Sequence, residues 1–351
     1  MNRLSRLLLV VLYVVSAAMM VTAQAETEAE PAAGVYNLSA PLTVTPGPGF
    51  AGVAVSPEGD KVAAISGFDS LIIAYNTENF SEIGRYEGGA GTDEIAYTLD
   101  GRLLVAFIYD SDLEITDIAV FDAETMALQG RFQPAFESIN HLVTDSDSAY
   151  FYGTTRSDEA TTYTLVKLDL ETLTVSAETE AIEAANFTPP YLNLREVDGA
   201  LIGIIFFDEG SQIFEWDSAD LSQLLNEDFR GRLSHDGDGF YAYQTSFLND
   251  DEVRVYQHFT KTALDDEEPT PLGDSLCYLL DFSLPTNETY MVGVGYRCEL
   301  ALFNLTTGKI DFRLEGKIGA GVAVSPAGDQ IYVAAETGLE VHPVTFTPDE
   351  G

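Results

Sequence analysis

Short runs of apolar residues alternate with tight polar turns along most of the chain. From about residue 35 onward, runs rich in Val, Ile, Phe, Tyr and Leu are separated by clusters of Gly, Asp, Asn, Ser and Pro. Apolar runs of this kind, bounded by turn residues, predict β-strands, and almost no part of the chain shows a helical period. The pattern therefore indicates an all-β protein.

The first repeating unit divides into four strands. The pattern predicts strands over residues 52–56, 61–66, 70–75 and 80–86. The first turn is Ser56-Pro-Glu-Gly-Asp60, in which Gly59 can adopt a positive φ without a steric penalty. The third strand of this unit recurs six times, at residues 117–121, 163–168, 212–216, 253–258, 299–303 and 339–344.

The repeat has a period that is typical of one fold. The segment Ala51-Gly-Val-Ala-Val-Ser-Pro-Glu-Gly-Asp60 returns near the other end as Ala320-Gly-Val-Ala-Val-Ser-Pro-Ala-Gly-Asp329. Turns between first and second strands, at intervals of 40 to 51 residues, are centred near Gly59, Gly101, Ser148, Gly199, Gly239, Asn287 and Gly328. A period of roughly 40–50 residues with four strands is characteristic of β-propellers. We expect a seven-bladed β-propeller of four-stranded antiparallel blades.

The two ends of the repeat array suggest how the ring closes. The last unit has no fourth strand, and an extra apolar run over residues 35–44 precedes the first unit. If the extra N-terminal run pairs with the incomplete last unit, it covers two strand edges that would otherwise stay open. We therefore expect the N-terminal strand to complete the last blade.

Several motifs carry a resemblance to a known group. They are the turns Ser56-Pro-Glu-Gly-Asp60 and Ser325-Pro-Ala-Gly-Asp329, and the strand endings Val120-Phe-Asp122, Leu168-Asp-Leu170 and Phe303-Asn-Leu305, with one literal Trp-Asp pair at Trp216-Asp217. Over about residues 35–344 the chain resembles the YVTN/WD40-like β-propellers, although it lacks the Gly-His half of the WD40 repeat. The resemblance implies a fold rather than an activity, because such propellers include both enzymes and binding platforms.

The N-terminus has the pattern of a secretory signal. Arg3 and Arg6 precede an apolar run from Leu7 to Val15, and Ala23-Gln-Ala25 supplies a cleavage site. We expect a signal peptide over 1–25, a flexible acidic leader over 26–34 and a single propeller domain over 35–351. The protein would be exported to the periplasm or beyond the cell, with no integral membrane span after signal removal.

The net charge of the mature chain limits the classes of partner that it can bind. Removing residues 1–25 takes away two of the 17 basic residues and no acidic residue, leaving 15 against 57 and a charge of about −42. Nucleic acid and anionic membranes are excluded as partners, because both need Lys and Arg to neutralise phosphates. The charge is compatible with a salty habitat, with Ca²⁺ or with a cationic partner.

The loops between second and third strands are expected to form an acidic binding face. These loops would lie at one mouth of the channel, where a ring of like charge favours cations. The candidate residues are Asp69, Asp110, Asp112, Asp158, Glu159, Asp208, Glu209, Asp250 and Asp251. The alternative is that Asp is simply an ordinary turn residue, since the turns on the opposite face are acidic as well.

Two cysteines fall toward the same face of the predicted sixth blade. Cys277 precedes the first strand of that blade, and Cys298 starts its third strand. Exported proteins form disulfides readily. We expect these two residues to pair.

Recognisable catalytic chemistry is sparse. The four histidines, His141, His235, His258 and His342, do not have the spacing of metal ligands. The chain contains neither a nucleophile elbow nor a glycine-rich phosphate loop. We expect no cofactor and no catalytic residues.

These observations favour an exported, non-enzymatic propeller that binds a protein or another ligand through an acidic face. One alternative is a Ca²⁺-dependent hydrolase of the lactonase type, with inner-strand candidates Glu94, Asn140, Asn193 and Asp281. A second alternative is a propeller subunit of a redox complex resembling amine dehydrogenase heavy chains. Whether inner-strand carboxylates and amides converge on one point would separate the first alternative from simple binding.

Overall fold

The computed structural model describes most of the chain from residue 34 onward. The described residues are 34–46, 49–66, 71–88, 90–110, 115–157, 160–184, 191–195, 199–207, 210–229, 232–235, 239–248, 251–260, 278–286, 289–296, 298–307, 309–314 and 319–348. The proposed signal peptide and leader therefore lie almost entirely outside them. Within the described ranges, no helix has the length and apolar character needed to cross a membrane.

The described residues form antiparallel sheets, which we number along the chain. Sheet one contains β3 (Gly52–Val55), β4 (Lys61–Ile65), β5 (Leu71–Asn76) and β6 (Glu82–Glu87). Sheet two contains β7 (Ala90–Tyr97), β8 (Leu103–Asp110), β9 (Ile115–Asp122) and β10 (Leu128–Phe132). Sheet three contains β11 (Ser138–Thr144), β12 (Ser148–Arg156), β13 (Thr161–Asp169) and β14 (Thr174–Glu178), with β15 (Ile182–Ala184) also paired to β13.

The second half of the chain continues the pattern. Sheet four contains β16 (Tyr191–Arg195), β17 (Ala200–Phe207), β18 (Gly210–Asp217) and β19 (Gln223–Phe229). Sheet five contains β20 (Arg232–His235), β21 (Gly239–Leu248) and β22 (Asp251–Thr260) in its described part. Sheet six contains β23 (Tyr278–Ser283), β24 (Tyr290–Tyr296), β25 (Cys298–Asn304) and β26 (Lys309–Leu314). Sheet seven contains β27 (Gly319–Val324), β28 (Gln330–Ala335) and β29 (Gly338–Pro348).

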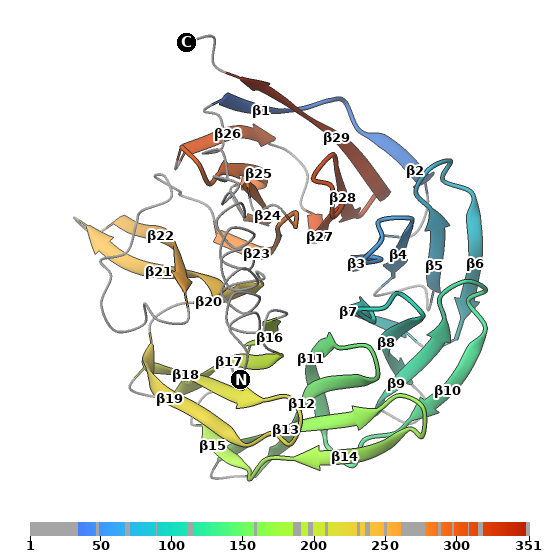
Figure 1. The fold of residues 1–351 in the computed structure, drawn as a ribbon, viewed down its shortest axis with the longest axis vertical. Helices are drawn as coiled ribbons and strands as arrows, with labels where there is room; N and C mark the ends of the chain where they lie inside the picture. The colour runs from blue at the N-terminus through green and yellow to red at the C-terminus, as the bar shows by residue number, and fades with distance from the viewer. Residues whose placement is uncertain are drawn as a thin grey trace, which may run out of the picture.

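The sheets stand around a common centre, with their first strands innermost (Figure 1). All four strands predicted for the first unit overlap β3, β4, β5 and β6. The six predicted recurrences of the third strand all fall within β9, β13, β18, β22, β25 and β29. The prediction of an all-β, propeller-like fold is therefore confirmed.

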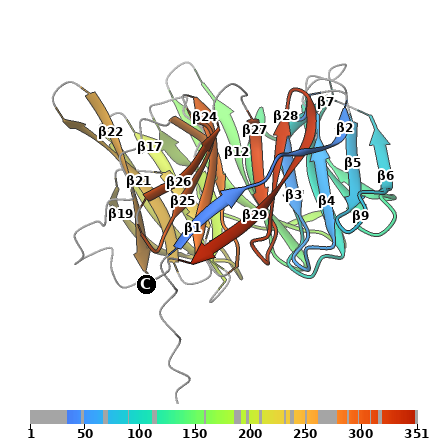
Figure 2. The same ribbon diagram turned by 90° about the horizontal axis from the view of Figure 1, so that it is seen from above.

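The N-terminal run pairs with the last strand of the chain. It forms two strands, β1 (Gly34–Leu38) and β2 (Leu42–Pro46), rather than the single strand expected over 35–44. Both are antiparallel to β29: β1 pairs with its second half and β2 with its first half (Figure 2). Sheet six also holds β1, because Asp311 Oδ2 accepts a hydrogen bond of 2.7 Å from Tyr36 N.

The core lies between neighbouring sheets, and strand alternation decides which side chain faces which neighbour. On β8, Leu104 and Ala106 belong to the apolar cluster shared with sheet one. The intervening residues Val105 and Phe107 belong to the cluster shared with sheet three. Successive side chains on a strand point to opposite faces. Each fully buried side chain of this size stabilises the fold by about 1.5–3 kcal/mol, so a sheet depends on both of its neighbours.

A serine hydroxyl stabilises the turn that follows the innermost strand by donating one hydrogen bond and accepting another. In sheet one, Ser56 Oγ donates to Asp60 Oδ1 (2.8 Å) and accepts from Lys61 N (3.0 Å). Ser325 repeats both bonds with Asp329 and Gln330 in sheet seven. Gly59 has a φ of 73°, as expected from the sequence. The duplicated Ser-Pro-x-Gly-Asp motif is therefore a duplicated hydrogen-bonded turn.

The turn that follows the third strand places an apolar side chain between sheets. In sheet two, Asp122 Oδ1 accepts hydrogen bonds from Glu124 N and Thr125 N, and Met126 then adopts a φ of 58°. Four residues after the corresponding strand endings, the same left-handed conformation occurs at Phe80, Leu173 and Leu221. A non-glycine residue there costs roughly 1–2 kcal/mol, which burial in the clusters between sheets offsets.

A glycine on the outer strand of the preceding sheet receives this side chain. A Cβ added at Gly84 of β6 would lie 2.9 Å from Met126 Cβ, and one at Gly130 of β10 would overlap Leu173 Cδ1. Both separations are below the usual contact distance. The sequence therefore pairs a small residue on one sheet with a left-handed apolar residue on the next.

We expect Gly84→Ala to lower the free energy of unfolding by about 1–3 kcal/mol, because the added methyl group overpacks this contact. In Gly84→Ala/Met126→Gly the loss of stability should be smaller than the sum of the two single losses, since removing Met126 Cβ makes room for the added methyl group. Urea unfolding of the four proteins measures the coupling. Glu87→Ala, an exposed change on the same strand, should stay within about 0.5 kcal/mol. Strict additivity of the two changes would contradict the proposed contact.

Candidate functional site: two grooves between sheets

The acidic face expected from the sequence is not covered by the structure. Asp69, Asp112, Asp158, Glu159, Asp208, Glu209 and Asp250 lie outside the described residues. Asp110 ends β8 and Asp251 starts β22, but their side chains are not described. Cys277 is likewise outside the described part, as is the side chain of Cys298. The acidic face and the disulfide stay predictions.

The opposite face, formed by the turns that end the first and third strands, carries a groove between sheets one and two. This first groove has a volume of about 480 Å³. Its walls are the turn at Ser56–Lys61, the turn at Asp100–Leu103 and the turn that begins at Asp122. Five carboxylates and two cations line it: Glu58, Asp60, Asp100, Asp122 and Glu124, with Lys61 and Arg102.

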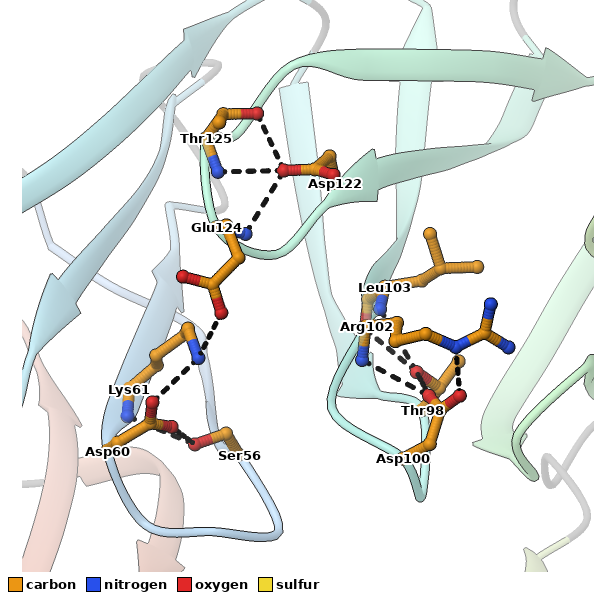
Figure 3. Close-up of polar contacts among 10 residues, drawn as sticks. All are labelled: Ser56, Asp60, Lys61, Thr98, Asp100, Arg102, Leu103, Asp122, Glu124 and Thr125. Atoms are coloured by element: carbon orange, nitrogen blue, oxygen red, sulfur yellow. Dashed lines mark hydrogen bonds and ion pairs between the residues drawn. The ribbon is translucent and has the colours of Figure 1, made fainter.

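Lys61 bridges the two sheets at the bottom of the first groove. Its ammonium lies 2.7 Å from Asp60 Oδ2 and 2.7 Å from Glu124 Oε1 (Figure 3). The Lys61 side chain is only 9% exposed, whereas that of Glu124 is 72% exposed. Glu124 thus reaches from solvent to a buried ammonium group across the seam, by which we mean the interface between two neighbouring sheets.

The ion pairs of Lys61 shift the pKa values of Asp60 and of Lys61 itself. Burial alone would raise the pKa of Asp60, but the hydrogen bonds from Lys61 and Ser56 outweigh burial and hold it below its ordinary value. Burial would lower the pKa of Lys61, but its bonds to Asp60 and Glu124 outweigh this and raise it. Both groups therefore stay charged at neutral pH.

Arg102 forms a second bridge and separates the first groove from another. Its guanidinium contacts Asp100 (Figure 3), and its terminal nitrogen lies 3.1 Å from Asp147 Oδ1 of sheet three. Beyond it lies the second groove, of about 550 Å³, which shares Arg102, Leu103 and Gln129 with the first. Its further lining includes the carboxylates Asp147, Asp169 and Glu171.

Tyr97 ends β7. It is 6% exposed and packs in the apolar cluster between sheets one and two. Its phenol oxygen is buried and has no hydrogen-bond partner in the part of the chain described. Burial raises the pKa of Tyr97, and the nearby charges of Asp60 and Glu124 raise it further.

The inner-strand candidates for calcium have structural contacts. Glu94 Oε2 accepts a hydrogen bond of 2.9 Å from Leu142 N, and Glu94 Oε1 lies 3.6 Å from His141 Nδ1. Asn140 donates to Thr154 Oγ1 at 2.8 Å. Asn193 and Asp281 lie in β16 and β23, but their side chains are not described.

The four histidines lie in three different sheets. His141 has a φ of 51° at an irregularity of β11, and His342 is buried, 3.6 Å from Glu340 Oε2. His235 ends β20, and His258 lies in β22 of the same sheet. Among the side chains that are described, no three His, Cys, Asp or Glu residues are grouped as a metal site.

Sequence patterns alone missed the two bridges. The signal was present as a basic residue directly after an acidic turn, in Asp60-Lys61 and Asp100-Gly-Arg102. Taken alone, each of these segments predicts only a turn with an ordinary acidic residue. The partner carboxylates Glu124 and Asp147 come from different repeats, so no local pattern connects them.

Comparison with known proteins supports the fold of this chain and assigns it to no family. No protein-family model matches the chain, and no curated protein matches it either. Among solved structures, the chain is similar to a chain of hydrazine synthase from Kuenenia stuttgartiensis, with a TM-score of 0.60 and 13% sequence identity. The match covers 87% of this chain and 97% of that one. At this identity the likeness shows a common fold.

We expect Lys61→Met to lower the free energy of unfolding by about 1–3 kcal/mol at pH 7, because Asp60 loses its buried partner. Since the pKa of Asp60 is lowered in the folded state, this contribution is present above its unfolded pKa of about 3.9 and is lost as the pH falls through the folded value. The difference between wild type and variant should therefore persist at pH 5 and shrink below about pH 4.

Urea unfolding of wild type and Lys61→Met across this pH range measures the difference in their free energies of unfolding. Arg85→Met is the matched control, because Arg85 pairs with Glu82 within β6 and its side chain is 47% exposed. An exposed ion pair contributes much less to stability than one whose cation is buried. Equal losses for the two variants, or a difference that does not change with pH, would contradict the buried bridge.

Proposed function

We propose that this chain is an exported, seven-bladed β-propeller of the YVTN/WD40-like group that binds a protein or another cationic ligand and catalyses no reaction. Its sheets are the blades, and β1 and β2 complete the last blade. Export is supported by the signal pattern that ends at Ala25. The closed ring is supported by contacts between consecutive innermost strands and by the contact of β27 with β3.

The observation that carries the binding function is the pair of neighbouring grooves on one face. In both grooves carboxylates outnumber cations, and Lys61 and Arg102 are each already paired with two carboxylates. A groove with excess negative charge and partial shielding from solvent attracts cations more strongly than an open surface. An extended segment with spaced Lys or Arg residues matches two such grooves in adjacent seams.

A second candidate is a propeller subunit of a redox complex. The observation in its favour is the likeness to a chain of hydrazine synthase, which extends over 87% of this chain. In that case the propeller would bind a redox protein, so the platform function would have a specific partner. Visible absorption of material that copurifies with the mature chain separates the two, since a haem or flavin spectrum favours the redox complex.

We expect the mature chain, residues 26–351, to bind a labelled peptide in which Lys alternates with Gly and Ser, because the grooves have excess negative charge. Fluorescence anisotropy in about 0.15 M salt measures this binding, and affinity should fall as salt shortens the Debye length. The control is the same peptide with Glu in place of Lys. Equal binding of both peptides, or of neither, would contradict the proposed function.

We also expect the thermal midpoint of the mature chain to be the same in about 1 mM Ca²⁺ and in EDTA at matched ionic strength. A ligand that binds only the folded state would raise the midpoint in proportion to its occupancy. A rise of several degrees would instead favour the calcium-dependent hydrolase and would justify a screen of lactones and esters.

A further inference from the structure

We propose that the surface that holds β1 also binds the N-terminal strand of a second copy, so that two copies of this chain exchange residues 34–46. We call residues 34–46 the strap, and we call the surface of β25, β26 and β29 that holds β1 the seat (Figure 2). The inference goes beyond the proposed function, because the seat shares no residue with the lining of either groove.

Two side chains of sheet six bind the backbone of β1. Asp311 Oδ2 accepts a hydrogen bond of 2.7 Å from Tyr36 N, and Asn304 Nδ2 donates one of 2.9 Å to Gly34 O. Asn304 Nδ2 also donates to Asp311 Oδ2 at 2.8 Å, and Asn304 is almost fully buried. The C=O of one strand residue and the N–H two positions later point to the same edge. Asn304 and Asp311 therefore bind one edge of β1, while β29 pairs with the other.

The seat also selects the side chains of the strand. The Tyr36 ring contacts those of Tyr290 and Phe346, with centroid separations of 4.9 and 4.8 Å, and Tyr36 is 9% exposed. A Cβ added at Gly34 would overlap the Phe346 ring. Val35, in contrast, is 41% exposed. The seat thus fits a strand that starts with glycine and has an aromatic residue two positions later, which is the sequence of the strap itself.

The groups that form the seat come from the other end of the chain. Asp311 lies 275 positions from Tyr36, and Asn304 lies 270 positions from Gly34. An identical copy offers the same strap, so the contacts within the seat are the same for either source. Exchange of an identical element between copies is a low-cost route to a dimer.

A short connector favours the chain's own strap. Phe50 N donates to Ala335 O at 3.1 Å, so the chain is fixed on its own ring from this residue onward. Only Gly47-Pro48-Gly49 separates Phe50 from the strap. Such a connector gives the own strap an effective concentration on the order of 1 mM. At about 0.2 mM protein roughly one strap in six should therefore be exchanged, and at about 0.02 mM roughly one in fifty.

Two single-cysteine variants detect the exchange. Val35 of β1 pairs with Thr347 of β29, and both are exposed. Mature Val35→Cys and Thr347→Cys are unfolded in urea and refolded together in about 1 M salt, which screens the repulsion between the acidic copies. A disulfide between these two positions of unlike copies requires the strap of one copy on β29 of the other. Non-reducing electrophoresis and mass spectrometry measure the unlike dimer.

A mixture of Val35→Cys with Glu178→Cys gives the background of random cross-linking, because Glu178 is exposed on β14 of sheet three. Cys277 and Cys298 are present in both mixtures and contribute equally to that background. We expect unlike dimers well above this background at about 0.2 mM, and roughly eightfold fewer at about 0.02 mM.

A competing peptide tests whether the seat recognises the strap. An excess of a peptide with the sequence of residues 34–46 should abolish the unlike dimer. The same peptide with Tyr36→Ala should not, because it lacks the aromatic ring that Tyr290 and Phe346 contact.

Two results would overturn the inference. If the unlike dimer does not exceed the background, each seat takes only its own strap. If both peptides inhibit equally, the seat does not select its ligand. Neither result depends on binding of the Lys peptide, so the inference and the proposed function can fail separately.

Discussion

Face-to-face packing between neighbouring sheets is the interaction on which the whole molecule depends. Each strand presents apolar side chains to both sides, as Leu104 and Val105 do from adjacent positions on β8. Only the sheet before and the sheet after can cover these two faces. A sheet without a neighbour would leave one of its apolar faces in water, so the sheets are stable as a series rather than one by one. Near the two ends of the described chain, β1 and β2 pair with β29.

The seams between sheets are apolar in the middle and polar at the turns. Left-handed apolar residues such as Met126 extend the core outward, and glycines such as Gly84 make room for them. At the edge of the seams the bonds become ionic or polar: Lys61 reaches Glu124, Arg102 reaches Asp147, and Lys167 donates to Ser218 O of the next sheet at 2.8 Å. In a chain with 17 basic residues against 57 acidic ones, these cations lie where negatively charged turns of adjacent sheets approach each other.

The sequence was sufficient for the architecture because the repeat is local. The strands after Ser56 and after Ser325 could be placed from one motif, and the shared hydroxyl bonds explain why that motif forms a turn twice. The break of the N-terminal run into β1 and β2 was missed, since it depends on pairing with two halves of a strand some 300 residues away. The grooves were missed for the same reason: Glu124 and Lys61 belong to different repeats. Tyr97 looked like any other core aromatic, and only its three-dimensional surroundings reveal the unpartnered hydroxyl.

The large negative charge and the buried bridges respond differently to salt. Repulsion among exposed carboxylates acts through solvent and is screened over about 8 Å at physiological ionic strength. The Lys61 ammonium is shielded by the protein, so added salt weakens its attraction to Asp60 and Glu124 less than it weakens the repulsion between the exposed carboxylates of the turns that it joins. Salt should thus tighten the seams while it lowers the attraction of the grooves for an external cation. A habitat rich in salt would favour a stable scaffold, and binding there would have to rely on direct contacts inside the groove, such as those with Glu124, rather than on long-range attraction.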